Sequence, residues 1–355
     1  MELPCPVSIE RVERFTGSGG PLLRPITWGM ICRQMSRSLP WLCSASIQRL
    51  AREWDDVTTD DGTTLEWFGT STFRIRTQGV TVFFDGYLDR LPGLEPVGLS
   101  TREVEQADFV FVSHAHFDHL YGVDALALQT GATVVASPES TRYLRASGIP
   151  EHQLIVVTGG ETVDCGHDVH VRVVPALHSC LFAASDSDSG VACLGDLGLS
   201  AQHRAAKVAE LFGMMSQAPP PAGAALMRML ETTSSHDGGQ LAFLLTNGSG
   251  SILVSGSAGY WRGLYTDLRP DVALLSVAGR PNVDGEPFQG SVAQFVVEQV
   301  KLLGAGSVAL CHHDPLFPGI PGVDIRAAAN MVRDEAPLVE YLELNYTTPI
   351  PLLGP

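Results

Sequence analysis

The feature that most constrains this chain is an apolar run that leads directly into a cluster of metal-competent side chains. Residues 107–112 are almost continuously apolar, which is typical of a strand buried in a sheet. Immediately after it come His114, His116, Asp118 and His119. Imidazole suits zinc and iron, and a carboxylate also suits harder cations or acts as a base. The segment therefore predicts a metal site at the end of a strand.

The spacing within this cluster predicts how the side chains divide between ions. Residues two apart on an extended chain point the same way, so His114 and His116 can face one ion. Asp118 and His119 follow where the chain bends, and they can face a second ion. A lone histidine is more often a hydrogen-bonded structural residue, but three histidines and an aspartate at fixed offsets favour metal binding.

The rest of the chain alternates short apolar runs with helical stretches, which indicates an α/β domain with sheets covered by helices. Strands are predicted over residues 63–68, 72–77, 80–84, 107–112, 133–136, 154–157, 169–174, 241–245, 252–255, 272–277 and 307–311, and helices over 140–146, 291–303 and 324–333.

Two segments depart from this pattern. Residues 1–60 build no strand series, and we interpret them as an N-terminal extension, partly disordered, ahead of a catalytic domain over 61–355. Residues 199–238 read as two helices separated by Pro219–Pro221, and we predict a helical insertion there. Its methionines suit either packing on the core or a lid over an apolar substrate.

The cluster His114-Ala-His116-Phe-Asp118-His119 resembles the H-x-H-x-D-H signature of metallo-β-lactamase-fold hydrolases. Residues 66–73 and 82–86 resemble that family's opening hairpins, so the resemblance covers about residues 63–345. It implies an α/β fold of four layers, the αββα metallo-β-lactamase sandwich, with the metal site at one edge. Relatives of this type include lactonases and phospholipase-D-like enzymes that act on N-acyl phospholipids.

The resemblance also implies two later ligands. His178 follows the alternating run Val171–Ala176, as the family's third histidine follows a strand. His312 follows the run 308–311 and takes the H-x-D position, so we prefer it to His313 as the last ligand. Asp314 is a candidate to orient an imidazole.

One family element is missing. A bridging aspartate is expected in a G-D-[ST] turn, but Gly256 and Ser257 occupy the corresponding positions and supply no carboxylate. Asp196, in an earlier Gly-Asp pair, is an alternative. Without a bridging carboxylate, we expect one tight metal ion, or two ions of unequal affinity.

These residues predict a zinc-type metallo-hydrolase with one or two Zn²⁺ ions, Mn²⁺ or Fe²⁺ being alternatives. His114, His116 and His178 would hold the first ion, and Asp118, His119 and His312 the second. A metal-bound hydroxide would cleave an ester, lactone or phosphodiester in a small or lipid-like substrate, with Asp118 as the catalytic residue. The alternatives are a degenerate metal-binding module without catalysis and a non-hydrolytic iron redox protein on the same fold.

The composition restricts the expected binding partners and the expected cellular compartment. A formal net charge of −16 disfavours nucleic acid as a partner, because phosphates are repelled at long range. The seven cysteines are odd in number and form no C-x-x-C pair, so a reducing compartment is expected. No apolar run is long enough to span a bilayer, and we expect a cytoplasmic protein.

Overall fold

The computed structural model describes residues 62–185, 187–215 and 220–353. The extension predicted over residues 1–60 lies outside these residues. None of the described helices is long and apolar enough to cross a membrane. The cysteines in the described part of the chain, Cys165, Cys180, Cys193 and Cys311, are all unpaired.

The first sheet has the strand order β17-β1-β2-β3-β4-β5-β6. Antiparallel hairpins join β1, β2 and β3, whereas β3 to β6 run parallel to one another. Its strands are β1 (Thr63–Trp67), β2 (Phe73–Thr77), β3 (Val80–Phe84), β4 (Phe109–Phe111), β5 (Thr133–Ala136), β6 (Leu154–Val156) and β17 (Ile350–Leu353).

The second sheet has the order β16-β15-β12-β10-β9-β8-β7, with a parallel half from β10 to β16 and an antiparallel half from β7 to β10. Its strands are β7 (Thr162–Asp164), β8 (His170–Pro175), β9 (Leu241–Asn247), β10 (Gly250–Ser255), β12 (Val272–Ser276), β15 (Ser307–Cys311) and β16 (Glu340–Leu342). A small third sheet contains β11 (Gly259–Tyr260), β13 (Asn282–Val283) and β14 (Glu286–Pro287).

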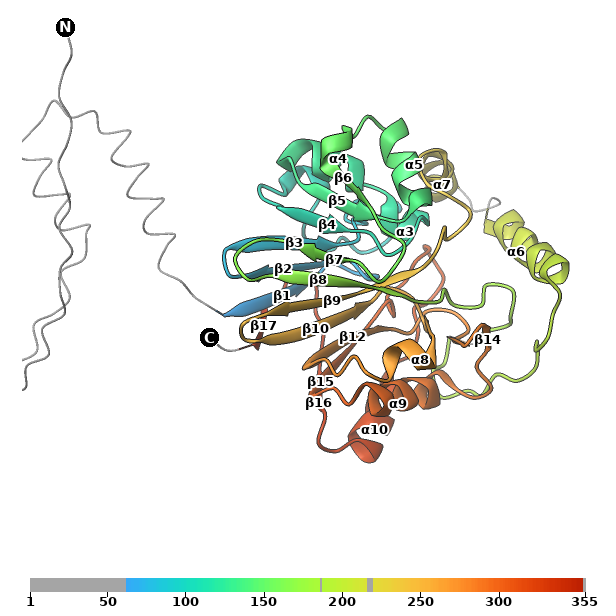
Figure 1. Ribbon diagram of the computed structural model, residues 1–355. Coiled ribbons are helices and arrows are strands. Elements are labelled where there is room, and N and C mark those ends of the chain that lie inside the picture. The colour runs from blue at the N-terminus through green and yellow to red at the C-terminus, as the bar shows by residue number, and fades with distance from the viewer. Residues whose placement is uncertain (1–61, 186, 216–219, 354–355) are drawn as a thin grey trace, which may run out of the picture. The chain divides into compact units, whose positions relative to one another are not determined.

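Helices cover the outer face of each large sheet, so the domain has four layers (Figure 1). On the first sheet lie α4 (Val123–Thr130) and α5 (Pro138–Ala146), and on the second α8 (Arg262–Tyr265), α9 (Val292–Leu303) and α10 (Arg326–Glu335). The remaining helices are α3 (Phe117–Leu120), α6 (Ala201–Met215) and α7 (Ala222–Glu231), with short 3-10 turns at Thr101–Glu103 and Glu151–Gln153. The predicted αββα metallo-β-lactamase sandwich is confirmed.

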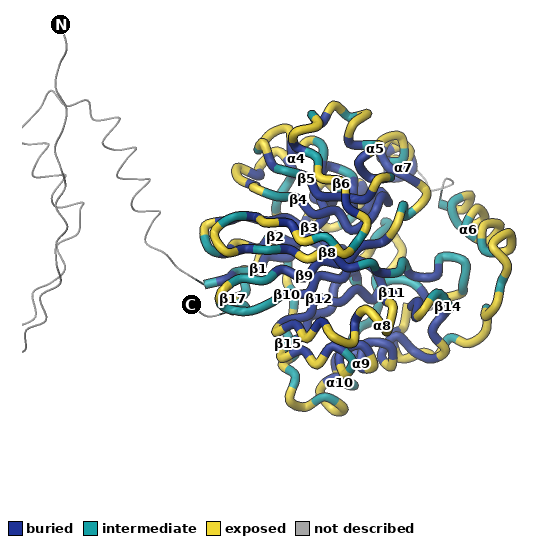
Figure 2. Tube along the Cα trace, in the orientation of Figure 1, coloured by how far each residue is buried: buried dark blue, intermediate teal, exposed yellow. Residues whose placement is uncertain are grey.

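The inner strands, such as β3 and β12, are buried because their side chains contribute to two different interfaces (Figure 2). In β3, Val82 and Phe84 point between the sheets, and Phe83 points toward the helices of the first sheet. Between the sheets, the ring of Phe243 lies 5.3 Å from Phe111 and 5.7 Å from Phe84. Alternation of side chains along each strand therefore produces the layered core.

The segment between residues 199 and 238 contains α6 and α7, which differ in burial. Helix α7 buries Leu226 and Met229 against the domain. Helix α6 has no buried residue, and Figure 1 shows it at the margin of the domain, beyond α7. The position of α6 therefore depends on contacts made by one face only.

The aromatic cluster between the sheets predicts a large stability effect at its centre. Replacing Phe243 (1% exposed) by alanine leaves a cavity, and we expect the free energy of unfolding to fall by about 3–5 kcal/mol in urea titrations. The control is Leu338→Ala, since Leu338 is 97% exposed and should change stability by less than about 0.5 kcal/mol. Equal effects in the two variants would contradict this account of the core.

Candidate metal centre

The predicted site residues come from three strand ends that the fold brings to one edge. The loop after β4 supplies His114 and His116, and the short helix α3 that follows it supplies Asp118 and His119. His178 follows β8, and His312 directly follows β15. Because β4 belongs to the first sheet and β8 and β15 to the second, the site lies where the two sheets meet. This is the edge at which parallel strands such as β4 and β15 have their carboxyl ends.

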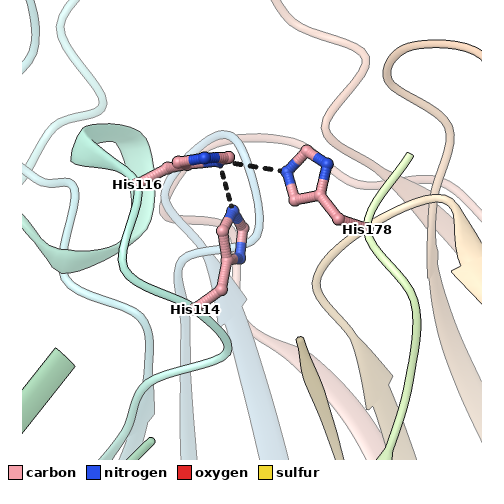
Figure 3. Close-up of side chains that lie close together, drawn as sticks. All are labelled: His114, His116 and His178. Atoms are coloured by element: carbon pink, nitrogen blue, oxygen red, sulfur yellow. Dashed lines mark hydrogen bonds between the residues drawn. The ribbon is translucent and has the colours of Figure 1, made fainter. Parts of the chain in front are cut away.

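Three imidazoles converge in the first donor group, formed by His114, His116 and His178 (Figure 3). The Nδ1 atom of His116 lies 3.1 Å from His114 Nε2 and 3.1 Å from His178 Nε2. Nitrogen ligands of a tetrahedral zinc ion lie about 3.3 Å apart, because each Zn–N bond is about 2.0–2.1 Å. The spacing of these three nitrogens therefore fits a shared cation.

In His114 and His178, the ring nitrogen that faces away from the other imidazoles of this group contacts a neighbouring residue. His178 Nδ1 lies 2.9 Å from the carbonyl oxygen of Ser179, and His114 Nδ1 lies 3.0 Å from the hydroxyl oxygen of Ser113. Contacts of this kind select the tautomer that leaves the other nitrogen free for a metal.

Asp118, His119 and His312 form the second donor group. Asp118 Oδ2 lies 3.1 Å from His312 Nε2 and 3.3 Å from His119 Nε2. His312 adopts a left-handed backbone conformation, with φ of 57°, and its N–H donates to the carbonyl of Thr70. A non-glycine residue rarely adopts this conformation, and such residues concentrate at functional sites.

Asp85, which was missed from the sequence, connects the second donor group to the fold. Its Oδ2 lies 2.7 Å from His119 Nδ1 and accepts hydrogen bonds from the hydroxyls of Ser71 (2.6 Å) and Ser113 (2.9 Å). Its Oδ1 accepts the backbone N–H of Ser113 at 2.7 Å. Its position in the sequence could have indicated this role. Asp85 directly follows β3, the neighbour of β4, so its side chain lies beside the ligand loop, the loop after β4 that contains His114 and His116.

Electrostatics distinguish the two donor groups. Burial, together with the neighbouring imidazoles, lowers the pKa of His114 well below its usual value and that of His116 to about 3. Burial also lowers the pKa of His178. The first group therefore presents neutral imidazoles, which is the form that binds a metal.

In the second donor group, charge interactions outweigh burial. Burial opposes ionisation of Asp118, but His119 and His312 hold the pKa of that carboxyl well below its usual range. Burial likewise lowers the pKa of His119, yet Asp118 and Asp85 raise it to about 10. Ionised Asp118 therefore pairs with a protonated His119, and a cation bound in this group would replace the proton on His119 Nε2.

The turn at Gly256 and Ser257, where the family has its bridging aspartate, packs against the site. Ser257 is buried, and its hydroxyl accepts the backbone N–H of Ser179. A Cβ atom at Gly256 would lie 2.7 Å from the Ser113 hydroxyl and 3.4 Å from Asp85 Oδ2. This turn therefore packs directly against the Asp85 network, and a residue larger than glycine at position 256 would displace it.

The other candidate ligands lie elsewhere. Asp196 forms an ion pair with Lys207, at 2.9 Å, and belongs to neither donor group. His313 stacks on Trp67 with ring centroids 4.9 Å apart, and it lines a separate cavity with residues of α10.

The suggestion that Asp314 orients an imidazole is wrong. Its carboxylate accepts the backbone N–H of Thr70, the Tyr346 hydroxyl and the Arg90 guanidinium. Asp85 makes the imidazole contact instead, because it lies at the end of β3 next to the ligand loop, and Asp314 lies beyond β15.

The two donor groups line a cavity of about 690 Å³. His116, Asp118, His178 and His312 contribute to its wall. The other lining residues are mostly apolar, and eight of them come from α6 and from the loop after β15: Leu211, Phe212, Met214, Met215, Leu316, Phe317, Pro318 and Ile320. A substrate in this cavity would therefore contact both the predicted ligands and an apolar wall.

Residues 80–195 match the family model described as a beta-lactamase superfamily domain. A UPF0173 metal-dependent hydrolase of Roseiflexus sp. (strain RS-1) is 32% identical over 130 residues, 36% of this chain and 51% of that protein. One of Chloroflexus aurantiacus is 36% identical over 117 residues, 33% of this chain and 47% of that protein. The chain thus spans about half the length of these curated relatives, whose names specify neither a lactonase nor a phospholipase.

Solved structures share the fold. Igni18, a metallo hydrolase from Ignicoccus hospitalis, has a TM-score of 0.54 at 17% identity, over 81% of this chain and 97% of that one. An isothiocyanate hydrolase from Delia radicum gut bacteria has a TM-score of 0.51 at 11% identity, over 82% of this chain and 100% of that one. A CmlA beta-hydroxylase variant has a TM-score of 0.51 at 17% identity, over 91% of this chain and 60% of that one.

The family-model match contains the segment that supplies His114, His116, Asp118 and His119, and the four-layer fold agrees with it. Residues 80–195 are therefore similar to the beta-lactamase superfamily domain, and the described residues share the fold of solved metallo-hydrolases.

Proposed function

We propose that this protein is a metal-dependent hydrolase. The observation that carries the proposal is the pair of three-residue donor groups, with ligand atoms spaced for shared cations, in the wall of a cavity of about 690 Å³. The first group is His114, His116 and His178, and the second is Asp118, His119 and His312. Five imidazoles and one carboxylate suit Zn²⁺, with Mn²⁺ and Fe²⁺ as alternatives.

The two donor groups would hold a divalent ion, which would supply a lower pKa for bound water and polarisation of the attacked carbonyl or phosphoryl oxygen. The chain supplies the positioning. Asp118 is buried at the cavity wall, where it orients the nucleophile and can pass a proton to the leaving group. Asp85 holds His119 in one orientation, and the apolar wall limits access of bulk water.

The substrate that we propose is an ester, lactone or phosphodiester in a small or lipid-like molecule. The names of curated relatives support hydrolysis, and the apolar cavity supports the lipid-like part. A CmlA beta-hydroxylase variant shares the fold, so the fold alone does not select the reaction.

The first prediction concerns metal content. Elemental mass spectrometry of protein purified without chelators should find one to two equivalents of zinc, falling by at least one in His116→Ala, because that variant removes a central nitrogen of the first group. His203→Ala is the control, since His203 lies on exposed α6 outside both groups. Wild-type protein that takes up no metal after zinc is supplied would contradict the proposal. Iron with oxygen consumption would favour the redox alternative.

The second prediction separates catalysis from metal binding. At saturating zinc, Asp118→Ala should lower kcat by about 100-fold or more, because the variant lacks the group that orients the nucleophile and transfers a proton. Asp196→Ala, which removes a carboxylate outside both groups, should retain the wild-type kcat. A metal-loaded Asp118→Ala protein with wild-type turnover would exclude the catalytic role.

The third prediction tests the Asp85 network. Asp85→Asn replaces one accepting oxygen by an amide N–H₂, so His119 loses its charged partner and zinc affinity should fall about 10–100-fold in chelator competition. Asp108→Asn is the matched control, since Asp108 accepts the Thr81 N–H near β3 and contacts no ligand. Unchanged affinity in Asp85→Asn would show that the network is not needed for metal binding.

A further inference from the structure

The charged and polar side chains that line the cavity restrict which substrates it can bind. Its lining contains no lysine or arginine in the described part of the chain, and Asp118 is its only carboxylate. Apart from the metal ligands, its polar side chains are the hydroxyls of Ser179 and Ser257. The cavity therefore offers no fixed cation to a phosphate, sulfate or carboxylate group of a substrate.

Cationic side chains near the lining segments are engaged in other contacts and do not line the cavity. Arg280, next to the lining residue Gly279, donates to three backbone carbonyls, and the others described here pair with carboxylates. Lys207 and Arg204 of α6 bind Asp196 and Glu286, respectively. Arg90 binds Asp314, next to the loop that contains Phe317. The formal net charge of −16 adds a long-range repulsion of anionic substrates.

The apolar wall extends outward from the metal ligands. The ring of Phe212 lies 6.3 Å from that of His116, and Met215 packs with Leu316 and Phe317 in the cluster around Phe117. Farther out, Met214 and Ile320 are 60% and 58% exposed although they are large and apolar. Continuous apolar surface from a ligand to solvent fits an extended hydrocarbon group that passes along it.

We infer that the substrate is an uncharged carboxylic ester or lactone with an extended apolar acyl chain, and that Phe212 and the rest of this wall select the chain. The inference rests on the hydrolase function proposed above. Water adds across the acyl C–O bond: its oxygen bonds to the acyl carbon, the C–O bond breaks, and a proton passes to the leaving alkoxide. An ester gives a carboxylic acid and an alcohol, and a lactone opens to a single hydroxy acid. Phosphodiesters are disfavoured because the described lining of the cavity has no lysine or arginine to bind the phosphate.

The test compares zinc-loaded protein on p-nitrophenyl acetate, butyrate and octanoate, and on bis(p-nitrophenyl) phosphate, which has the same leaving group. We expect kcat/KM to rise about fourfold for each methylene buried by the cavity, and the phosphodiester to react at least about 100-fold more slowly than the octanoate. An ester series without chain-length dependence, or preference for the phosphodiester, would overturn the inferred substrate while leaving the hydrolase function intact.

Variants of the cavity wall then test which residues determine the preference for long acyl chains. Phe212→Ala should lower the octanoate-to-acetate ratio of kcat/KM by about tenfold or more, and Leu316→Ala should lower it in the same direction. Leu128→Ala, on α4 and outside the cavity lining, should leave the ratio unchanged. Ratios unchanged in both cavity variants would overturn the role of the wall.

A binding measurement separates failure of the inference from failure of the proposed function. If no substrate is hydrolysed, calorimetry with the neutral ligand octanamide tests the cavity directly. Binding that is weakened at least about fivefold by Phe212→Ala supports the apolar selectivity even though hydrolysis has failed. Absence of octanamide binding overturns it.

Discussion

The buried carboxylate of Asp85 connects the fold to the site. It accepts hydrogen bonds from Ser71 and Ser113 and contacts His119, so it joins the first hairpin, the end of β3 and the loop after β4. Asp85 itself has a φ of 55°, an uncommon backbone conformation that these contacts maintain. A buried carboxylate without such partners would be strongly destabilising, so the network and the ligand geometry depend on each other.

The layered packing brings the ligands from each sheet together. Phe84, Phe111 and Phe243 fill the space between the sheets beneath the strand ends and fix the separation of β4 from the second sheet. The ends of β8 and β15 then place His178 and His312 opposite the loop and the short helix α3 that contain the other ligands. Rigid strand ends suit a site in which ligand positions must hold to fractions of an ångström.

The site combines two environments that differ in charge. The first donor group is a set of neutral imidazoles, whereas the second contains ionised Asp118 beside a protonated His119 that also contacts Asp85. The rest of the cavity is apolar and, among the residues described, has no cationic side chain. An ion bound here would thus be the principal positive charge available to a substrate, and hydrocarbon contacts would supply much of the remaining binding energy.

Some strands could be predicted because their signals are local. The runs 80–84, 133–136 and 307–311 are β3, β5 and β15 with the predicted bounds. The edge strand β17 was not predicted, because it is short, contains Pro351 and exists through its pairing with β1. The short helices α3 and α8 were likewise missed, since four residues carry no helical period.

The sequence by itself determined an α/β domain with sheets covered by helices and the metal-competent cluster, because strand patterning and the spacing of His114, His116, Asp118 and His119 are local properties of the chain. The four-layer αββα arrangement was implied only by the family resemblance. Only the tertiary structure decided that Asp85, and not Asp314, contacts an imidazole, and that Asp196 and His313 lie apart from the donor groups. It also decided that α6 and the loop after β15 form one apolar wall. These facts depend on which distant segments pack together, and no local spacing encodes that.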